Sequence, residues 1–406
     1  MKHVWILNHY AQEPGGPGGT RHFGLAKHLR DYGWDASIIA ASTELNTNRQ
    51  RLSEHESSRK EYFEDVRFLW LKTQPYQGNG LDRIKNMFQY AIKAIAVNLK
   101  AKLPSPDIII GSSVHPLAAV AGLILARRYS VPFIFEVRDL WPETLIALGR
   151  IRKGGLQDRL LGYIEKLLYK KAEKIITLLP GVVHYVEKLG VDGKKVVWIP
   201  NGIDVTQFKD YPYSENKTTF TLMYFGAHGT ANGLENLLEA INVLNDNPHK
   251  IKIHLRLIGD GPFKETLMKK SIELGVSESV SFEDPVSKDQ IPELASQADA
   301  FVFNLVDAPV FQYGISSNKL FDFMASARPT IFCCNALNNP VEDAGSGITV
   351  QPENPAALAK AIEELSLRPY QERLEMGYNG RKYVFENHGF DRLAKRLAGV
   401  LDELST

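Results

Sequence analysis

The sequence is poor in cysteine, in paired acidic metal ligands and in long apolar runs. Its only two cysteines, Cys333 and Cys334, are adjacent and lie in an apolar segment. Neighbouring cysteines rarely pair with each other, so we expect no disulfide framework and a reducing compartment. No metal-ligand cluster accompanies them. The sequence also contains no Asp-x-Asp pair, so it lacks the usual carboxylate cradle for a divalent ion on a diphosphate. We therefore expect no metal site and no cofactor.

The charge balance and hydropathy exclude further classes. The net charge of +1 argues against a bulk polyanion-binding surface, so nucleic acid is not an expected partner. An apolar share of 44% with 23% charged residues is typical of a soluble globular protein. We see neither an apolar run long enough to cross a bilayer nor a signal peptide before the first strand. These absences predict a cytoplasmic protein. Whether it also contacts the inner face of the cell membrane is left open at this point.

The 406 residues predict two or three domains. Short apolar runs alternate with amphipathic helices, which is the signature of parallel sheets covered on both faces. The expected strands are residues 4–7, 36–40, 67–71, 107–111, 133–137, 174–178, 196–199, 219–225, 253–258, 280–282, 300–305 and 331–333. A Pro-Asn-Gly turn at residues 200–202 and a polar stretch at 205–218 mark the domain boundary. The sequence thus predicts two α/β domains with a cleft between them, and ligands beyond the carboxyl ends of the strands.

Three strand ends in the first half carry candidate ligand-binding residues. The first is the glycine-rich loop containing Gly18 and Gly19, which leads into a helix at Arg21 and could approach an anion, although a plain flexible turn remains the alternative. The second is His115, just before a helix; a lone histidine is more often structural. The third is a charged cluster, in which a salt bridge shaping the cleft is the competing interpretation. It includes Arg138, Asp139 and Glu143.

The second half offers two glycine turns after strands and one polar helix start. The turns carry Gly226, His228 and Gly229, then Gly259, Asp260 and Gly261. Such turns let phosphates or a base approach the backbone, although each is weak evidence alone. The helix start follows Tyr313–Ser317 and comprises Asn318, Lys319, Leu320 and Asp322. Its free N–H groups and Lys319 favour an anion, while Asp322 offers a carboxylate to ribose hydroxyls; an ordinary core helix with solvated Lys and Asp is the alternative.

One segment bears on membrane contact. Between residues 81 and 102, five apolar side chains fall on one helical face, and four basic ones lie away from it. The apolar residues are Ile84, Phe88, Ile92, Ile95 and Leu99, and the basic ones are Arg83, Lys85, Lys93 and Lys100. This pattern predicts either an interfacial helix on anionic lipid or a helix packed on the core with a solvated basic face.

Taken together, these motifs resemble the retaining glycosyltransferases of family 4, which have the two-domain GT-B fold. The resemblance rests on four segments in order: residues 199–204, 226–234, 259–262 and 318–325. Within the family the chain looks most similar to bacterial enzymes of surface polysaccharide (O-antigen or capsule) synthesis, through residues 135–143 and 313–316. The resemblance implies two Rossmann-like domains, at 1–204 and 205–386. It also implies a C-terminal helix, at 387–406, that crosses back to the first domain.

The resemblance also implies chemistry. We expect metal-independent transfer of a hexosyl or N-acetylhexosaminyl group, with retention, from a nucleotide-sugar, with UDP as the first choice of carrier and GDP second. The acceptor would be a glycan or a lipid-linked saccharide bound on the first domain, near Arg21, Arg138 and Glu143. His115 and Asp139 would face the reacting carbon, the diphosphate would lie between the loop 226–229 and Lys319, and the base near 259–261. The resemblance says nothing of oligomeric state.

Departures from the family pattern leave other functions open. The family's two glutamates, eight positions apart, fall on Gly314 and Asp322, and its common Arg and Lys fall on Ala227 and Asn232. We expect Lys319, His228 and helix-end N–H groups to replace them, with Arg21 a weaker candidate. A sugar-nucleotide epimerase of the same architecture, and a catalytically silent partner of another transferase, are the alternatives. Product formation without acceptor would favour the epimerase, and the absence of any affinity for nucleoside diphosphates would favour the silent partner.

Overall fold

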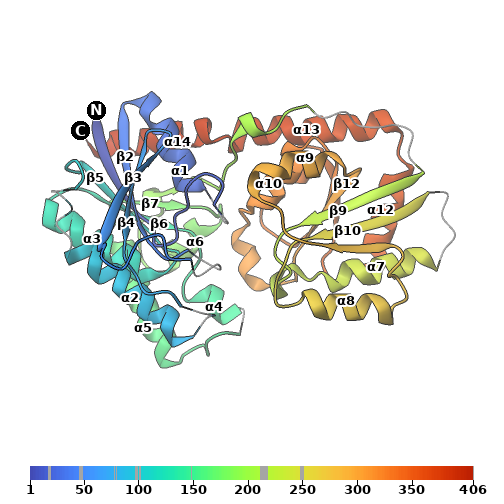
Figure 1. The fold of residues 1–406 in the computed structure, drawn as a ribbon, viewed down its shortest axis with the longest axis horizontal. Helices are drawn as coiled ribbons and strands as arrows, with labels where there is room; N and C mark the ends of the chain where they lie inside the picture. The colour runs from blue at the N-terminus through green and yellow to red at the C-terminus, as the bar shows by residue number, and fades with distance from the viewer. Residues whose placement is uncertain are drawn as a thin grey trace. The chain divides into compact units, whose positions relative to one another are not determined.

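The computed structural model divides into two compact units, which are described separately (Figure 1). It describes residues 1–16, 20–44, 49–76, 78, 80–96, 99, 102–147, 149–210, 218–246 and 251–405. The first unit comprises Met1–Gly202, Tyr313–Ser316 and Phe390–Thr406, and the second comprises Ile203–Gln312 and Ser317–Gly389. The predicted glycines Gly18 and Gly19 lie outside the described residues.

The first unit is built on an eight-stranded sheet in the order β3-β4-β2-β1-β5-β6-β7-β8. All neighbouring strands are parallel except the edge strand β3, which runs antiparallel to β4. The strands are β1 (Lys2–Leu7), β2 (Trp34–Ala41), β3 (Ser58–Phe63), β4 (Val66–Leu71), β5 (Ile108–Ser112), β6 (Phe133–Val137), β7 (Lys174–Thr177) and β8 (Val196–Trp198). The central strands are buried on both faces, as their continuous apolar runs predict.

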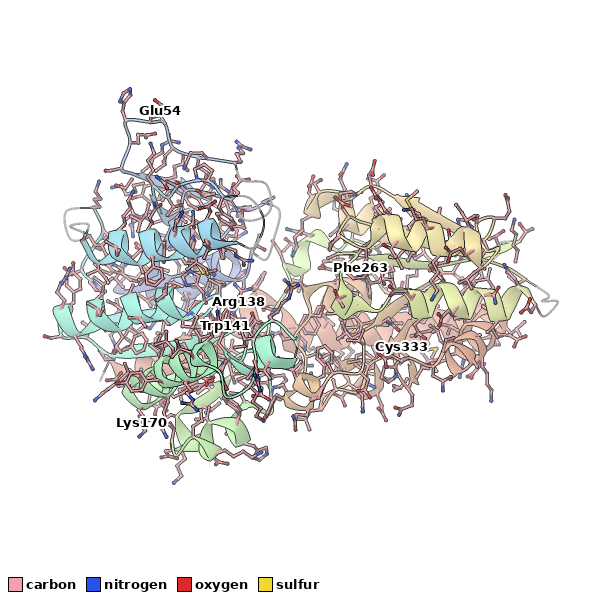
Figure 2. All side chains as sticks on the ribbon, turned by 90° about the horizontal axis from the view of Figure 1, so that it is seen from below. Glu54, Arg138, Trp141, Lys170, Phe263 and Cys333 are labelled. Atoms are coloured by element: carbon pink, nitrogen blue, oxygen red, sulfur yellow. The ribbon has the colours of Figure 1, made fainter. Side chains whose placement is uncertain are left out.

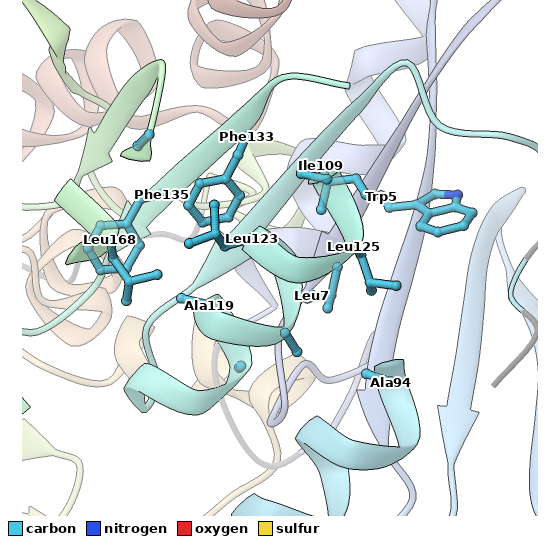
Figure 3. Packing of buried hydrophobic residues seen from close by; sticks show 14 of the residues in the cluster. Trp5, Leu7, Ala94, Ile109, Ala119, Leu123, Leu125, Phe133, Phe135 and Leu168 are labelled. Carbon is cyan, nitrogen blue, oxygen red and sulfur yellow. The ribbon is translucent and has the colours of Figure 1, made fainter. Parts of the chain in front are cut away.

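Helices cover both faces of this sheet and form two separate cores. They are α1 (Arg21–Leu29), α2 (Leu81–Ala96), α3 (Pro116–Tyr129), α4 (Glu143–Ala147), α5 (Leu156–Lys171), α6 (Val182–Lys188) and α14 (Phe390–Leu404). On one face, α2, α3, α5 and α6 pack on the sheet; Figure 3 shows Ala119 and Leu123 of α3 facing Phe133 and Phe135 of β6. On the other face, α1 and α14 pack together, and Phe390 of α14 lies against Gly24 of α1.

The second unit is a six-stranded, fully parallel sheet in the order β11-β10-β9-β12-β13-β14. The strands are β9 (Thr219–Phe225), β10 (Lys252–Ile258), β11 (Val280–Glu283), β12 (Ala300–Asn304), β13 (Thr330–Cys333) and β14 (Gly347–Val350). The helices are α7 (Glu235–Asn245), α8 (Lys264–Glu273), α9 (Ile291–Ser296), α10 (Asn318–Ala325), α11 (Pro340–Asp343), α12 (Pro355–Leu367) and α13 (Tyr370–His388). Helix α7 contacts α8 and α12, whereas α10 contacts α9 and α13.

These elements confirm the predicted fold class of two parallel-sheet α/β domains with a helical C-terminus. The alternating pattern did not identify β3, which is largely polar, or β14, α4, α6 and α11, which are too short to show a clear period. The segment Tyr313–Ser316 belongs to the first unit: Tyr313 O accepts from Gly181 N at 2.9 Å, and Ser316 Oγ accepts from Asn201 N at 2.7 Å.

Two further sequence expectations can be compared with the structure. Cys333 and Cys334 are both buried free thiols, and burial raises the pKa of each to about 12. Within the described ranges, no helix combines the length and the apolar character needed to span a membrane.

Candidate functional site

Two glycine turns of the second unit interlock at the carboxyl ends of β9 and β10. Gly226 N donates to Ile258 O at 3.0 Å, and His228 N donates to Asp260 O at 2.8 Å. Gly259 and Gly261 have φ angles of +145° and +156°, and a Cβ on them would lie 2.0 Å from Gly226 O and 2.5 Å from His228 O. The two turns therefore form one backbone platform that only glycine permits at these positions.

Lys319, in the first turn of α10, reaches to this platform. Its Nζ donates to Tyr224 Oη at 2.9 Å and to Asn232 Oδ1, and it lies 4.6 Å from the centroid of the Tyr224 ring. Its Cδ would be 3.3 Å from a Cβ on Gly226. Among the described residues, no carboxylate lies within ion-pair distance of Lys319. Burial without such a partner lowers the pKa of Lys319 to about 7.

Near the platform, where the family pattern has an Arg and a Lys, the chain has a hydrogen-bonded network of asparagine side chains. Asn232 Nδ2 and Tyr224 Oη both donate to Ala227 O, at 2.8 and 2.9 Å. Asn304 Nδ2 donates to Asn232 O at 2.8 Å, and its Oδ1 accepts from Asn236 Nδ2 at 2.9 Å. Asn232 thus orients Lys319 instead of supplying a second cation, and this network fixes the position of the only lysine in α10.

His228 is fully buried between the two turns. Burial lowers its pKa to about 4; Lys264 acts in the same direction, Asp260 opposes it, and Lys319 has the smallest lowering effect. His228 is therefore neutral at pH 7 in the unliganded protein, and its expected contact with a diphosphate stays a prediction. Neither ring nitrogen has a hydrogen-bond partner among the residues with described positions. One ring N–H thus remains available as a neutral donor.

The remaining predicted residues of α10 differ in exposure. Asn318 opens the helix and is half-buried, whereas Leu320 is fully buried in the core. Any contact of Leu320 with a ligand would therefore run through its backbone. Asp322 is 4% exposed, and burial raises the pKa of its carboxyl group. Its Oδ1 has no hydrogen-bond partner in the described part of the chain, so the predicted ribose contact stays a prediction.

In the first unit, His115 pairs with a histidine that the sequence did not single out. His115 is the N-cap of α3, and its Nε2 lies 2.6 Å from His9 Nδ1. His9 stacks between Tyr10 and Tyr90, with ring centroids 4.1 and 4.6 Å away. Burial lowers the pKa of His115 to about 3, with a further effect of Arg83. The pair is therefore uncharged at neutral pH, and His115 can act as a hydrogen-bonding group.

Arg21 has internal partners that give it a structural role. Its Nε donates to Glu136 Oε1 at 2.9 Å, and its other nitrogens donate to the carbonyls of Ile199 and Pro200. His22 Nε2 lies 2.6 Å from the second oxygen of Glu136. Although burial opposes it, the charges of His22 and Arg21 hold the pKa of Glu136 well below its usual range. The expected contact of Arg21 with an acceptor or diphosphate stays a prediction.

The other acceptor-side candidates lie after β6. Arg138 and Trp141, both labelled in Figure 2, follow β6 along the chain, and Arg138 N donates to Ser113 Oγ at 3.1 Å. Asp139 has an exposed side chain, and the half-buried Glu143 begins α4. The structure thus brings Arg138 and Asp139 to the carboxyl end of β6, next to the loop that precedes His115.

Sequence reasoning missed Tyr224, Asn232, Asn304 and His9. Tyr224 and Asn304 are ordinary strand residues in the sequence, and their partners lie far away along the chain. In the sequence, Asn232 stood out only because it lacks the positive charge that the family commonly has at this position. His9 could have been found from its position at the end of β1, where ligands of parallel sheets gather.

Family models match both halves of the chain. Residues 18–202 match the family model described as glycosyl transferase 4-like domain, and residues 219–367 match the model described as glycosyl transferases group 1. A relative named as a colanic acid biosynthesis glycosyl transferase, WcaI of Escherichia coli (strain K12), is 23% identical over 77% of this chain and 79% of its own length.

Solved structures show the same fold. Sucrose-phosphate synthase from Thermosynechococcus elongatus has a TM-score of 0.76 at 17% identity, covering 100% of this chain and 99% of that one. Anabaena HepE, solved in complex with UDP and glucose, has a TM-score of 0.69 at 17% identity and covers 100% of both chains. The chain therefore belongs to the family 4 glycosyltransferases with the GT-B fold, and it is similar to bacterial polysaccharide glycosyltransferases.

Proposed function

We propose that this protein transfers a sugar, with retention of configuration, from a UDP-sugar to a glycan or lipid-linked acceptor in surface polysaccharide synthesis. In this proposal the second unit binds the nucleotide, and the first unit provides the acceptor side through His115, Asp139, Arg138 and Glu143. The polysaccharide context is suggested by the similarity to WcaI, and UDP by the HepE complex. The sugar would be hexosyl or N-acetylhexosaminyl.

The observation that carries the proposal is the unpaired cation Lys319 over a glycine platform at a helix start. A buried amine without a carboxylate is costly unless an anion binds there. The platform leaves backbone close to that amine, and the first turn of α10 adds free N–H groups. We propose that these groups meet the leaving-group charge of the diphosphate without a divalent ion, by electrostatic stabilisation. The His228 ring adds a neutral hydrogen-bond donor.

Calorimetry with UDP on the full chain tests this assignment. Lys319→Met is expected to weaken UDP binding by about tenfold or more, because a charge-assisted hydrogen bond contributes roughly 1.5–3 kcal/mol. Lys270→Met is the matched control: Lys270 pairs with Glu239 in the same unit, away from the platform. Unchanged UDP affinity in Lys319→Met would contradict the site. Sugar transfer that persists in excess EDTA would support the metal-independent mechanism, and its loss would refute that part.

We also propose that the first unit contacts anionic membrane through α2 and α5, which both pack beside α3. Of the predicted apolar face, Leu99 is buried and Ile95 packs on the core, as the core-packed alternative expects for these two residues. Exposed apolar residues are Leu81, Ile84, Phe88 and Ile92 on α2, and Leu156, Leu160 and Tyr163 on α5. Exposed cations on the same helices suit anionic lipid; they include Lys85, Arg159, Lys166 and Lys170.

Co-sedimentation with phosphatidylglycerol vesicles tests this contact. Phe88→Ser with Ile92→Ser is expected to lower the bound fraction several-fold, because each removes an apolar anchor. Ile272→Ser, which replaces a residue 71% exposed on α8 of the other unit, is the control. Wild-type protein that stays in the supernatant would refute the membrane proposal and leave the transferase proposal intact.

A further inference from the structure

The buried rings of His9 and His115 in the first unit share one hydrogen between two facing nitrogens. His9 Nδ1 and His115 Nε2 lie 2.6 Å apart, and the two ring planes are nearly perpendicular, at 83°. Burial lowers the pKa of each ring, so both are neutral at pH 7. A neutral imidazole has one N–H and one lone pair, so one of the facing nitrogens donates and the other accepts. The pair can therefore exist in two forms, which differ in the nitrogen that carries the hydrogen.

Helix α2 supplies the group that distinguishes these forms. Asn86 on α2 is buried, and its Nδ2 donates to Gln74 O at 2.5 Å. Asn86 Oδ1 and His9 Nε2 are both buried, and neither has a well-formed hydrogen bond to a described residue. The Asn86 side chain nevertheless interacts with the His9 ring and partly opposes the effect of burial on the pKa of His9, as an oxygen acceptor does. Since His9 Nδ1 already faces His115, this interaction falls on His9 Nε2.

The opposite orientation of the Asn86 amide is unfavourable. A flip would aim Nδ2 at His9 and place Oδ1 against Gln74 O, so two acceptors would meet across the 2.5 Å that the hydrogen bond now spans. Gln74 is itself held in place, because its N–H donates to Gln89 Oε1, also on α2, at 2.9 Å. The Gln74 carbonyl therefore fixes the amide, and the amide oxygen favours a hydrogen on His9 Nε2.

Aromatic stacking fixes the plane of the His9 ring. The ring is nearly parallel to those of Tyr10 and Tyr90, at interplanar angles of 22° and 17°. A rotation that exchanged Nδ1 with Nε2 would drive the edge of the imidazole into both tyrosines. Tyr90 lies one turn after Asn86 on α2, and its hydroxyl donates to Ile39 O at 2.7 Å. The ring therefore keeps Nδ1 towards His115 and Nε2 towards α2.

We propose that His9 is a positioning residue for His115, an inference that rests on the proposed transferase function and adds a residue to its acceptor side. The contacts with α2 place a hydrogen on His9 Nε2 and leave a lone pair on His9 Nδ1. That lone pair requires the hydrogen of His115 to be on Nε2. His115 Nδ1 then carries a lone pair and no hydrogen. This form leaves a hydrogen-bond acceptor at Nδ1 and excludes proton donation from that atom.

Long-range ¹H–¹⁵N NMR of the full chain with ¹⁵N-labelled histidine tests where the hydrogens lie in the unliganded protein. The method distinguishes a ring nitrogen that carries a hydrogen from one that carries a lone pair. The signals of the two rings are assigned by their loss in His9→Gln and His115→Gln. At pH 7 we expect both rings to carry the hydrogen on Nε2 and the lone pair on Nδ1. A hydrogen on Nδ1 of either ring, a mixture of forms, or a charged ring overturns the proposal.

Asn86→Leu tests whether α2 controls His115 through His9. The substitution leaves an N–H at His9 Nε2 buried without an acceptor, which costs more than a buried lone pair. The pair should therefore shift towards the opposite form, with the ratio of the two forms changed by about tenfold or more. His115 signals that stay unchanged in Asn86→Leu would overturn the proposal.

Two substitutions of His9 separate positioning from a merely structural role. His9→Gln keeps an oxygen acceptor for His115 Nε2 and should retain kcat for sugar transfer within about threefold, whereas His9→Phe keeps only the stacking and should lower kcat by about tenfold with the donor KM unchanged. Equal losses in both variants would overturn the positioning role. His254→Phe is the control, because His254 is bonded to Ser281 in the other unit. The NMR readout needs no substrate, so failure of the proposed function and failure of this inference are distinguishable.

Discussion

The unpaired Lys319 predicts that UDP affinity falls as the pH rises from 7 to 9. Burial places its pKa at about 7, so about half of the free protein carries the ammonium form at pH 7 and only about 1% at pH 9. A diphosphate binds the charged form, and the apparent dissociation constant rises in inverse proportion to its population. We expect UDP to bind roughly 50-fold more weakly at pH 9 than at pH 7, which corresponds to about 2.3 kcal/mol.

Two features make this prediction specific. The secondary ionisation of a phosphate lies near pH 6, so the ligand charge changes little across the window. The bound diphosphate raises the pKa of Lys319, and roughly half a proton should therefore be taken up per UDP at pH 7. Calorimetry in two buffers with different ionisation enthalpies measures this uptake directly. Lys319→Arg, which stays charged throughout, should show no such pH dependence.

The unliganded protein should respond to pH with the opposite sign. The folded pKa of Lys319 lies below the value of 10.5 expected for the unfolded chain, so the unfolded state binds more protons between these values. The contribution of Lys319 to the free energy of unfolding therefore rises with pH from about 7 to 10.5. Lys270→Met should retain both trends. UDP affinity that is constant from pH 7 to 9, or that falls equally in Lys319→Met, would refute the reasoning.

Further predictions concern the stability of each unit. Gly259→Ala places a Cβ 2.0 Å from Gly226 O, so urea denaturation should show a loss of about 2–4 kcal/mol, whereas Gly275→Ala, in open space at a φ of +69°, should cost only about 1 kcal/mol. Equal losses would refute the interlocked platform. Glu136→Gln removes a charge from a buried network with Arg21 and His22, and should cost about 3–5 kcal/mol; a neutral outcome would contradict that network. The pKa values of His115 and His228, about 3 and 4, lie below that of the unfolded chain, near 6.5. Unfolding free energy should therefore fall by up to ~1.4 kcal/mol per pH unit for each histidine between pH 6.5 and 4. In His228→Phe this slope should decrease, and an unchanged slope would show that His228 is accessible to protons.

Much of the fold follows from local sequence. The buried strands of both sheets are continuous apolar runs, and the helices between them have amphipathic periods, so the alternation of strand and helix predicts parallel sheets before any contact is known. The glycine turns could also be identified, because a positive φ close to another backbone excludes side chains at Gly259 and Gly261. Edge strands such as β3, with alternating exposure and little apolar content, do not carry that signal.

The sequence by itself determined the two-sheet architecture, the positions of the glycine turns and the candidate cation Lys319, because each is encoded by neighbouring residues. Only the tertiary structure decided what these residues can do. In the fold, Asn232 accepts a hydrogen bond from Lys319, which is 87 positions away, and Arg21 donates one to Glu136, which is 115 positions away. Burial lowers the pKa of His228 enough to keep the ring neutral at pH 7. Charge state and hydrogen-bond partners depend on burial and on residues distant in the chain, and no local pattern records either of them.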